Sequence, residues 1–189
     1  MSPALALTTP RLRLRPWRTD DLPAFAALNA DARVMEFLPK ILPREESDAY
    51  AARIGAHFRR HGFGCWAVEV VGHAEFIGFA GLTVPAFEAR FTPCVEIGWR
   101  LAYEHWGQGY ATEAAAAALD FAFDVLRLDE IVSFTAPANL RSIRVMQRLG
   151  MTRSPSDDFE HPGLPTGHPL RRHVLYRLPR SIWEQRGVE

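Results

Sequence analysis

The chain has 189 residues, of which 48% are hydrophobic and 23% charged, with a formal net charge of +0. We expect one globular domain over residues 1–189, with its core at about 7–178, and no nucleic-acid partner. No run of about 18 apolar residues predicts a membrane helix, and no signal peptide is recognisable, so we expect no membrane partner. Cys65 and Cys94 lie in apolar, strand-like runs, which favours buried free thiols and a cytoplasmic location over a disulfide.

The first third of the chain predicts a strand followed by helices. Leu12 to Pro16 alternates as in an edge strand, and Arg11, Arg13 and Arg15 would form one solvated face of it. Helices are expected over residues 21–29, 31–37 and 43–61, the last of them ended by Gly62.

The rest of the chain alternates strands and helices. We expect strands over 65–71, 76–82, 94–101, 129–135 and 172–178, and helices over 111–126 and 140–149, with a tail from Pro179 that packs through Trp183 or frays. Residues 154–171 form a long proline-rich loop, which is usual for functional or disordered segments. This loop and the strand after it hold three histidines near acidic residues, His161, His168 and His173, but their spacing matches no defined metal pattern, so no metal is expected.

The most informative stretch is a strand, a turn and a helix between Cys94 and Leu126. The turn reads Trp106-Gly-Gln-Gly-Tyr-Ala111, and the helix after it carries an alanine-rich apolar face. A helix that begins at such a turn presents free backbone N–H groups and a positive dipole, and glycines let a phosphate approach the backbone. The stretch therefore predicts a phosphate site made of main chain.

Three other interpretations of this turn are weaker. A P-loop would need Gly-Lys-Ser/Thr, which is not there. A dinucleotide fingerprint would need a third glycine where Thr112 stands, although Asp129 and Glu130 lie at a suitable distance, and only about sixty residues follow the helix. A plain strand-turn-helix connection does not account for two glycines before a long alanine-rich helix.

The turn resembles the acetyl-CoA motif Arg/Gln-x-x-Gly-x-Gly/Ala of the GNAT (Gcn5-related N-acetyltransferase) superfamily. Trp106 departs from the first position, and the string WGQGYATEA is similar to the branch that contains the ribosomal-protein N-terminal acetyltransferases. The resemblance extends from Leu7 to about Leu178. It implies an α/β GNAT fold, a strongly twisted mixed sheet of six to seven strands flanked by helices, whose early helices wall the acceptor site and whose 154–171 loop would edge that site.

A second motif follows the next strand. Asn139 precedes a helix that contains Ser142 and ends at Leu149-Gly150, which is similar to the GNAT pattern Asn-x-x-Ser. In that family the asparagine contacts the pantetheine arm, and a tyrosine four residues before the glycine often protonates the leaving thiolate. Met146 stands there and cannot donate a proton, so Ser142 is expected to meet the thiolate, by proton donation or by stabilisation alone. The alternative is that Asn139 and Ser142 only cap the helix.

Glu96 is the candidate base for the amine. A carboxylate in the apolar run Val95-Glu-Ile-Gly98 is costly unless it faces a cleft, where desolvation would raise its pKa. The alternative is a solvent-facing position on the strand. The family often places a glutamate here that acts through water, and it implies backbone oxyanion donors near Gly98 to Arg100, where a bulge splays the strands.

The resemblance to the GNAT superfamily implies an N-acetyltransferase that moves an acetyl group from acetyl-CoA to a primary amine by direct attack in a ternary complex. The residues expected to bind acetyl-CoA are Trp99, Leu101, Trp106, Gly107, Gln108, Gly109, Tyr110, Ala111, Thr112 and Asn139. The acceptor, a protein N-terminus or a small amine, stays open. The alternatives are a CoA-binding sensor or scaffold without catalysis, which the loss of tyrosine at Met146 favours, and an NAD-binding protein. The resembling branch also implies a homodimer.

Overall fold

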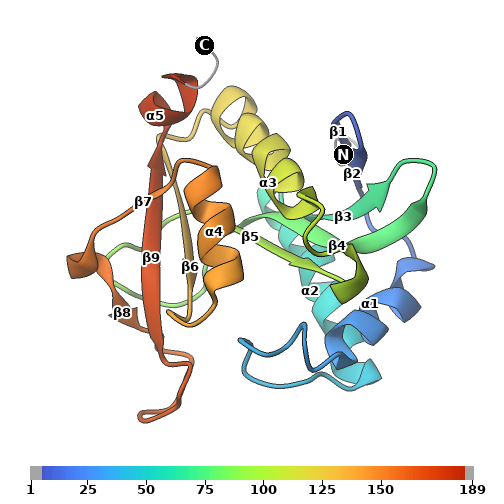
Figure 1. Cartoon of the computed structure of the whole chain (residues 1–189), viewed down its shortest axis with the longest axis horizontal. Coiled ribbons are helices and arrows are strands. Elements are labelled where there is room, and N and C mark those ends of the chain that lie inside the picture. The colour runs from blue at the N-terminus through green and yellow to red at the C-terminus, as the bar shows by residue number, and fades with distance from the viewer. Residues whose placement is uncertain (1–5, 186–189) are drawn as a thin grey trace.

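The computed structural model describes residues 6–185 and consists of a mixed sheet with helices packed on both faces (Figure 1). The predicted domain also includes residues 1–5 and 186–189, which lie outside the described residues. The strands are β1 (Leu7–Thr8), β2 (Leu12–Arg15), β3 (Cys65–Val70), β4 (Ala74–Thr83), β5 (Glu96–Leu101), β6 (Glu130–Thr135), β7 (Thr152–Arg153), β8 (Phe159–Glu160) and β9 (Arg172–Pro179). Their order is β1-β2-β3-β4-β5-β6-β9-β7, and β8 pairs with β9.

The helices are α1 (Asp21–Ala30), α2 (Arg44–His61), α3 (Tyr110–Asp120), α4 (Leu140–Arg148) and α5 (Arg180–Gln185). This arrangement confirms the predicted fold class. The described sheet has nine strands rather than the expected six to seven, because β1, β7 and β8 are two-residue strands that show no periodicity in the sequence. Within residues 6–185, none of the helices combines the length and apolar character that a membrane crossing requires.

Two predicted helices differ from the structure. Residues 31–37 form turns instead of a helix, because the Asp31 carboxylate accepts a hydrogen bond from the backbone N–H of Arg33 at 2.9 Å and so closes a local turn. The helix expected over 111–126 is α-helical to Asp120 and continues as a π-helical turn, Phe121–Val125. A pattern of apolar residues three and four apart does not separate these two kinds of turn.

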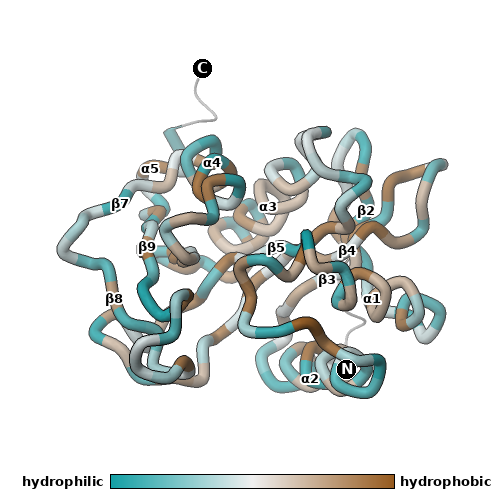
Figure 2. The backbone as a smooth tube through the Cα atoms, turned by 60° about the horizontal axis from the view of Figure 1, so that its bottom comes forward, coloured by the Kyte–Doolittle hydropathy of each residue, from teal (hydrophilic) through white to brown (hydrophobic). Residues whose placement is uncertain are grey.

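The sheet buries a different cluster on each face. Ala80 and Leu82 of β4 and Ile97 of β5 pack with the alanine face of α3, whereas Phe79 of β4 packs with Phe25 of α1 and Ile54 of α2. Figure 2 shows hydrophobic stretches concentrated along the inner strands, while α2 is largely hydrophilic on its outer side. The side chains of one strand therefore point alternately toward α3 and toward the α1–α2 pair.

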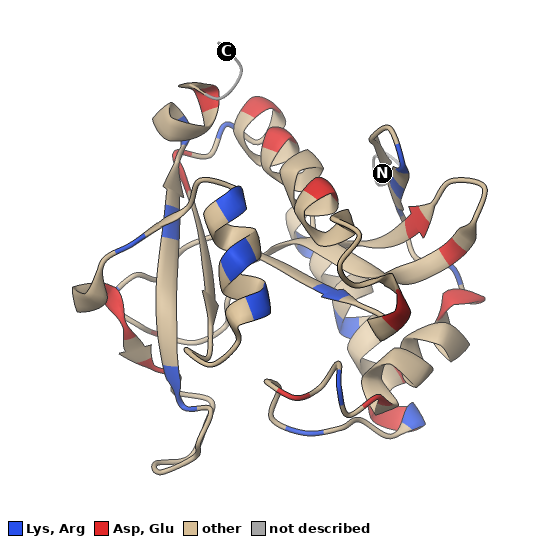
Figure 3. Ribbon diagram, viewed as in Figure 1, with Lys and Arg blue, Asp and Glu red and all other residues tan. Residues whose placement is uncertain are grey.

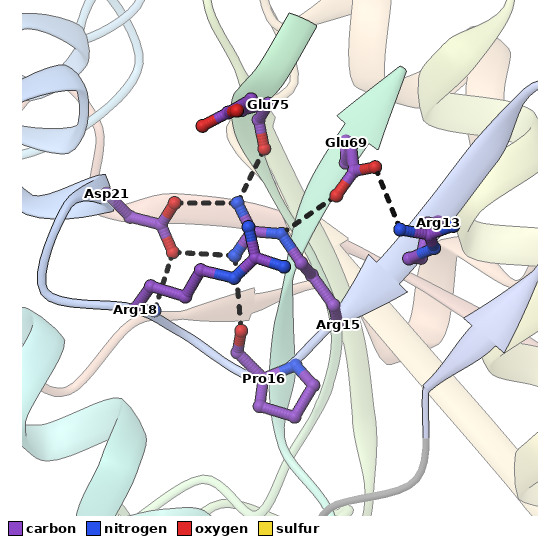
Figure 4. Close-up of polar contacts among 7 residues, drawn as sticks. All are labelled: Arg13, Arg15, Pro16, Arg18, Asp21, Glu69 and Glu75. Carbon is purple, nitrogen blue, oxygen red and sulfur yellow. Dashed lines mark hydrogen bonds and ion pairs between the residues drawn. The ribbon is translucent and has the colours of Figure 1, made fainter. Parts of the chain in front are cut away.

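Arg15 is buried rather than part of a solvated face, with 3% of its side chain exposed. Its guanidinium makes two hydrogen bonds to Asp21, at 2.7 and 2.8 Å, and one to Glu69 at 3.1 Å (Figure 4). It also donates to the carbonyl oxygens of Pro16 and Glu75. The expectation for this strand was wrong at Arg15, because the fold brings two ion partners to it, Asp21 at the start of α1 and Glu69 on β3, which alternation along β2 alone does not reveal.

The central strand β5 separates from β6 after a short contact. The two strands are parallel, and Glu96 opposite Val132 is the registered pair, although both strands continue further. On its other side β5 pairs with β4 without a register shift, from Glu96 opposite Thr83 to Leu101 opposite Gly78. The bulge expected in the central strand is therefore not there, and the strands diverge on the β6 side alone.

Candidate active site

A cavity of about 590 Å³ lies where β5 and β6 diverge. The turn before α3, the first turns of α4, the loop between α1 and α2, and the inner strands line it. Every predicted site residue except Gln108 lines this cavity: Glu96, Trp99, Leu101, Trp106, Gly107, Gly109, Tyr110, Ala111, Thr112, Asn139 and Ser142. The amide nitrogen of Gln108 instead donates to the carbonyl of Glu104 at 3.1 Å, on an exposed part of the turn.

The turn before α3 has the backbone that an anion site needs. Gly107 and Gly109 have φ angles of 75° and 84°, a left-handed conformation that side chains disfavour. Gly109 is the N-cap residue of α3, and no side chain caps the helix there. Thr112 Oγ1 is buried at this end of the cavity without a hydrogen-bond partner. A buried hydroxyl without a partner, beside free N–H groups at a helix start, fits a bound phosphate.

Arg11 stabilises this turn through hydrogen bonds, a role that the sequence did not indicate. Its Nε donates to Glu113 Oε2 at 2.6 Å, and its Nη1 donates to the Gln108 carbonyl at 3.0 Å. Thr9 adds a hydrogen bond to Glu113 at 2.5 Å. Although burial alone would raise the pKa of Glu113, the hydrogen bonds from Thr9 and Arg11 lower it. The connection between β1 and β2 therefore holds the glycine turn and the first turn of α3 together.

The contacts of Trp106 explain how a tryptophan can serve at the first position of the family motif. Its indole N–H donates to the carbonyl of Leu101 at 2.8 Å, which ties the turn to the end of β5. The guanidinium of Arg141, on α4, lies 4.6 Å from the centre of the Trp106 ring, and Arg141 also forms an ion pair with Glu36 of the α1–α2 loop. Trp106 thus fixes the turn by packing and a hydrogen bond, where an arginine or glutamine would offer charge or amide groups.

Asn139 is the N-cap of α4 and also positions Ser142. Its Oδ1 accepts from the Ser142 N–H at 3.2 Å, while its Nδ2 donates to Ser142 Oγ and to Thr135 Oγ1, both at 3.0 Å. Because Asn139 donates to Ser142 Oγ, the hydroxyl hydrogen of Ser142 is left to donate into the cavity. Capping therefore accounts for Asn139 within the chain, and the same amide orients the serine.

Glu96 is partly buried and faces the cavity on the α1–α2 side of β5. Burial raises the pKa of its carboxyl group to about 8, and a hydrogen bond from Thr83 at 3.3 Å opposes this shift only weakly. A carboxyl group whose pKa lies near neutrality is suited to accept a proton. Because Glu96 lines the cavity, it occupies the cleft-facing position on the strand and not the solvent-facing alternative.

The other groups considered for chemistry are not arranged for it. Cys65 and Cys94 are free thiols, and burial raises their pKa values to about 12 and about 11, which keeps both protonated. Among residues 6–185, no group of three or more acidic, histidine or cysteine side chains is placed to hold a metal ion. His161 and His173 pack against each other and against phenylalanines such as Phe159.

The sequence did not identify the residues that line the α1–α2 end of the cavity. Tyr50, Phe79 and Arg100 lie there, beside Val34 and Leu38 of the α1–α2 loop. Only Arg100 gave a signal that could have been used, since it is a charged residue in an apolar strand, as Glu96 is. Residues 154–171 are not among the described residues that line the cavity, but Phe159 and His161 pack against Phe134, which lines it, so a place for this loop beside the acceptor site stays a prediction.

Comparison with known proteins identifies relatives over most of the chain. The family model described as an acetyltransferase (GNAT) domain matches residues 11–152. The uncharacterized protein YkkB of Bacillus subtilis is 30% identical over 152 residues, 80% of this chain and 87% of the relative. The FsC-acetyl coenzyme A-N(2)-transacetylase of Aspergillus fumigatus is 31% identical over 188 residues, 94% of this chain and 77% of the relative. The solved acetyltransferase from Agrobacterium tumefaciens has a TM-score of 0.73 and 30% identity, over 92% of this chain and 94% of that one.

Proposed function

Because the chain belongs to the GNAT acetyltransferase family, and is therefore an acyltransferase, we propose that its cavity transfers an acetyl group from acetyl-CoA to a primary amine. The observation that carries this proposal is that one cavity holds the glycine turn, the carboxyl group of Glu96 and the hydroxyl of Ser142. Each of these supplies a different requirement of acyl transfer, namely anion binding, proton acceptance and stabilisation of a leaving thiolate.

The turn and the start of α3 would hold the pyrophosphate of acetyl-CoA. The N–H groups from Gly107 to Thr112 offer the donors, and Thr112 Oγ1 would gain the partner that it lacks within the chain. Trp99 and Leu101 would flank the pantetheine arm where β5 leaves β6, and Asn139 would contact it with the lone pair that the helix cap does not use.

The arginines of α4 would add positive charge beside the phosphates. Arg141, Arg144 and Arg148 line the cavity and appear as a row of blue bands along α4 in Figure 3. A phosphorylated cofactor gains charge-assisted hydrogen bonds from such a row, and acetyl-CoA carries three phosphate groups.

The chemistry then needs one base and one thiolate partner. Glu96 accepts a proton from the amine, directly or through water, as the amine nitrogen bonds to the acetyl carbon. The carbon–sulfur bond breaks, and the electron pair leaves with sulfur, where the Ser142 hydroxyl donates a hydrogen bond to the thiolate. Since Met146 is an apolar core residue at the position that often holds a tyrosine, the serine stabilises the thiolate rather than acting as a strong acid.

The proposal is tested by thermal unfolding with acetyl-CoA, with NAD as the control ligand, followed by thiol release from acetyl-CoA in the presence of amines. A ligand at a hundred times its dissociation constant adds about 2.7 kcal/mol to the free energy of unfolding, which is a measurable shift in Tm. A shift with acetyl-CoA alone is expected. No shift at saturating acetyl-CoA would contradict the assignment of the glycine turn.

A CoA-binding sensor without catalysis is the second candidate, since Met146 removes the usual acid. Glu96→Gln separates the two functions: an enzyme loses rate and keeps its affinity for acetyl-CoA, whereas a sensor has no turnover to lose. The branch that contains the ribosomal-protein acetyltransferases and the homodimer both stay predictions.

A further inference from the structure

We propose that the acceptor amine also carries a carboxylate, and that Arg100 binds this group at the α1–α2 end of the cavity. This inference rests on the proposed acetyl transfer and names the chemical class of its second substrate. It is carried by the position of one arginine, by the residues that hold it, and by the charges of the cavity wall.

Arg100 lines the cavity and has few partners there. Its guanidinium lies 5.3 Å from the ring centres of both Tyr50 and Phe79, and its Nη1 donates to Asn29 Oδ1 at 2.6 Å. No carboxylate among the described residues lies within ion-pair distance of it, whereas Arg15 on β2 has ion pairs with Asp21 and Glu69. A guanidinium has five N–H donors, and leaving a partly buried charge without a counter-ion is costly. An anionic ligand would supply that counter-ion.

A chain of buried polar groups holds Arg100 in this position. Asn29, which is fully buried, donates from Nδ2 to the buried Ser47 Oγ at 2.8 Å, and this fixes the direction of its Oδ1 toward Arg100. The carbonyl of Asn29 also accepts from the N–H of Leu42 at 3.0 Å, which closes the α1–α2 loop. Burying polar groups costs free energy unless they are hydrogen-bonded to one another. A network that ends in an arginine facing a cavity therefore indicates a binding site, in which the position of Arg100 is fixed before the ligand binds.

The spacing along β5 sets Arg100 against the candidate base. Glu96, Gly98 and Arg100 occupy alternate positions, so their side chains share the face of the strand that points toward α1 and α2. A side-chain carbon at Gly98 would meet no atom within 4 Å, so open space separates the other two groups. A small ligand lying over Gly98 can present its amine to Glu96 and its carboxylate to Arg100.

The charges of the cavity wall disfavour the main alternative, a polyamine. Glu96 is the only carboxylate among the described residues that line the cavity, while Arg100, Arg141, Arg144 and Arg148 line it as well. A second ammonium group would find no second carboxylate among these described lining residues and would be repelled by Arg100. The remaining wall at this end is apolar, with Val34, Phe37 and Leu38. A small amino acid therefore fits better than a polycation.

The test compares amines that differ only in the carboxylate. The wild-type protein is assayed for thiol release from acetyl-CoA with each common amino acid and with its carboxamide, and with spermidine. Arg100→Gln and Arg100→Lys are assayed with the same amines. Arg53→Gln is the matched control, since Arg53 lies over the same Tyr50 ring, at 5.2 Å, but on the exposed side and outside the cavity lining. The affinity of each variant for acetyl-CoA is measured to show that the cavity is intact.

We expect kcat/KM for at least one amino acid to exceed that for its carboxamide by about 100-fold, since hydrogen bonds from a guanidinium to a carboxylate are stronger than those to a neutral amide. Arg100→Gln should abolish this ratio, Arg100→Lys should retain part of it, and Arg53→Gln should leave it unchanged. Equal rates for acids and carboxamides, a preference for spermidine, or a ratio that survives Arg100→Gln would overturn the inference while leaving acetyl transfer intact. Failure of acetyl-CoA to bind would instead overturn the proposed function.

Discussion

Arg11 and Glu113 join the edge of the sheet to the start of α3, with 2.6 Å between Arg11 Nε and Glu113 Oε2. The same arginine donates to the backbone carbonyl of Gln108, inside the glycine turn. Neither contact lies in the cavity lining, yet both fix the segment whose N–H groups would bind the cofactor. The position of the phosphate site therefore depends on the connection between β1 and β2, about a hundred residues earlier in the chain.

Arg11→Gln should weaken acetyl-CoA binding several-fold with little loss of stability. The pair is partly exposed, with 48% of the Arg11 side chain accessible, and exposed ion pairs stabilise by up to about 1 kcal/mol. Titration calorimetry with acetyl-CoA measures the affinity. Arg44→Gln removes a comparably exposed pair, Arg44–Asp48 on α2, and serves as the control. If both variants bind acetyl-CoA with equal affinity, the contacts of Arg11 have no effect on the turn.

The rate should rise with pH according to the protonation of Glu96. Its pKa is raised to about 8, so the carboxylate that accepts the proton is the minor form at pH 7 and becomes the major form above pH 8. We expect kcat/KM to increase through this range with an apparent pKa near 8. In Glu96→Gln the rate should fall by about 100-fold or more, and this step in the profile should disappear. If kcat/KM of the wild type does not change from pH 6 to 9, with an acceptor amine that is unprotonated over this whole range, the role of Glu96 as base is contradicted.

The same group gives a prediction for stability. An unfolded glutamate has a pKa of about 4.5, so between pH 4.5 and 8 the unfolded chain has lost this proton while the folded protein keeps it. The contribution of Glu96 to stability is therefore full below pH 4.5 and falls as the pH rises toward 8, by up to about 1.4 kcal/mol per pH unit. Urea unfolding of the wild type and of Glu96→Gln across this range measures the free energy of unfolding of each protein. The value for the variant minus the value for the wild type should increase with pH and then level off above pH 8.

The sequence predicted the parts of the site that depend on neighbouring residues. Glu96 in its apolar run, the glycine turn and Asn139 before α4 are each recognisable within a few positions, because the backbone and burial of each are set locally. The partners of Arg11, Arg15 and Arg100 were not predictable in this way. They come from α3, α1 and the Asn29–Ser47 pair, which only the tertiary fold brings close.

Substitutions of Asn139 should distinguish its role as the cap of α4 from its role in orienting Ser142. In Asn139→Asp a carboxylate oxygen can still cap Ser142 N–H, but the donor to Ser142 Oγ is lost, and the new acceptor competes for the serine hydroxyl hydrogen. We expect nearly unchanged stability and a kcat lower by about 10-fold or more. Asn139→Ala should in addition lose about 1 kcal/mol of stability, because the cap is removed. If Asn139→Asp has wild-type kcat, the asparagine acts only as a cap and Ser142 needs no orientation.

Asp21 should be among the most sensitive positions for stability, although it lies outside the cavity lining. Only 3% of its side chain is exposed, and it accepts two hydrogen bonds from Arg15 and one from the N–H of Arg18 (Figure 4). Asp21→Ala leaves the buried arginine with Glu69 as its remaining ion partner, and breaking a buried pair from one side costs about 3–5 kcal/mol. Urea unfolding measures this loss. The double variant Arg15→Met/Asp21→Ala also removes the buried guanidinium that has lost its Asp21 partner, so it should be clearly more stable than Asp21→Ala alone. The single variant Arg15→Met completes the cycle: if its loss and that of Asp21→Ala add up to the loss of the double variant, Arg15 and Asp21 contribute independently, through packing rather than through their ion pair.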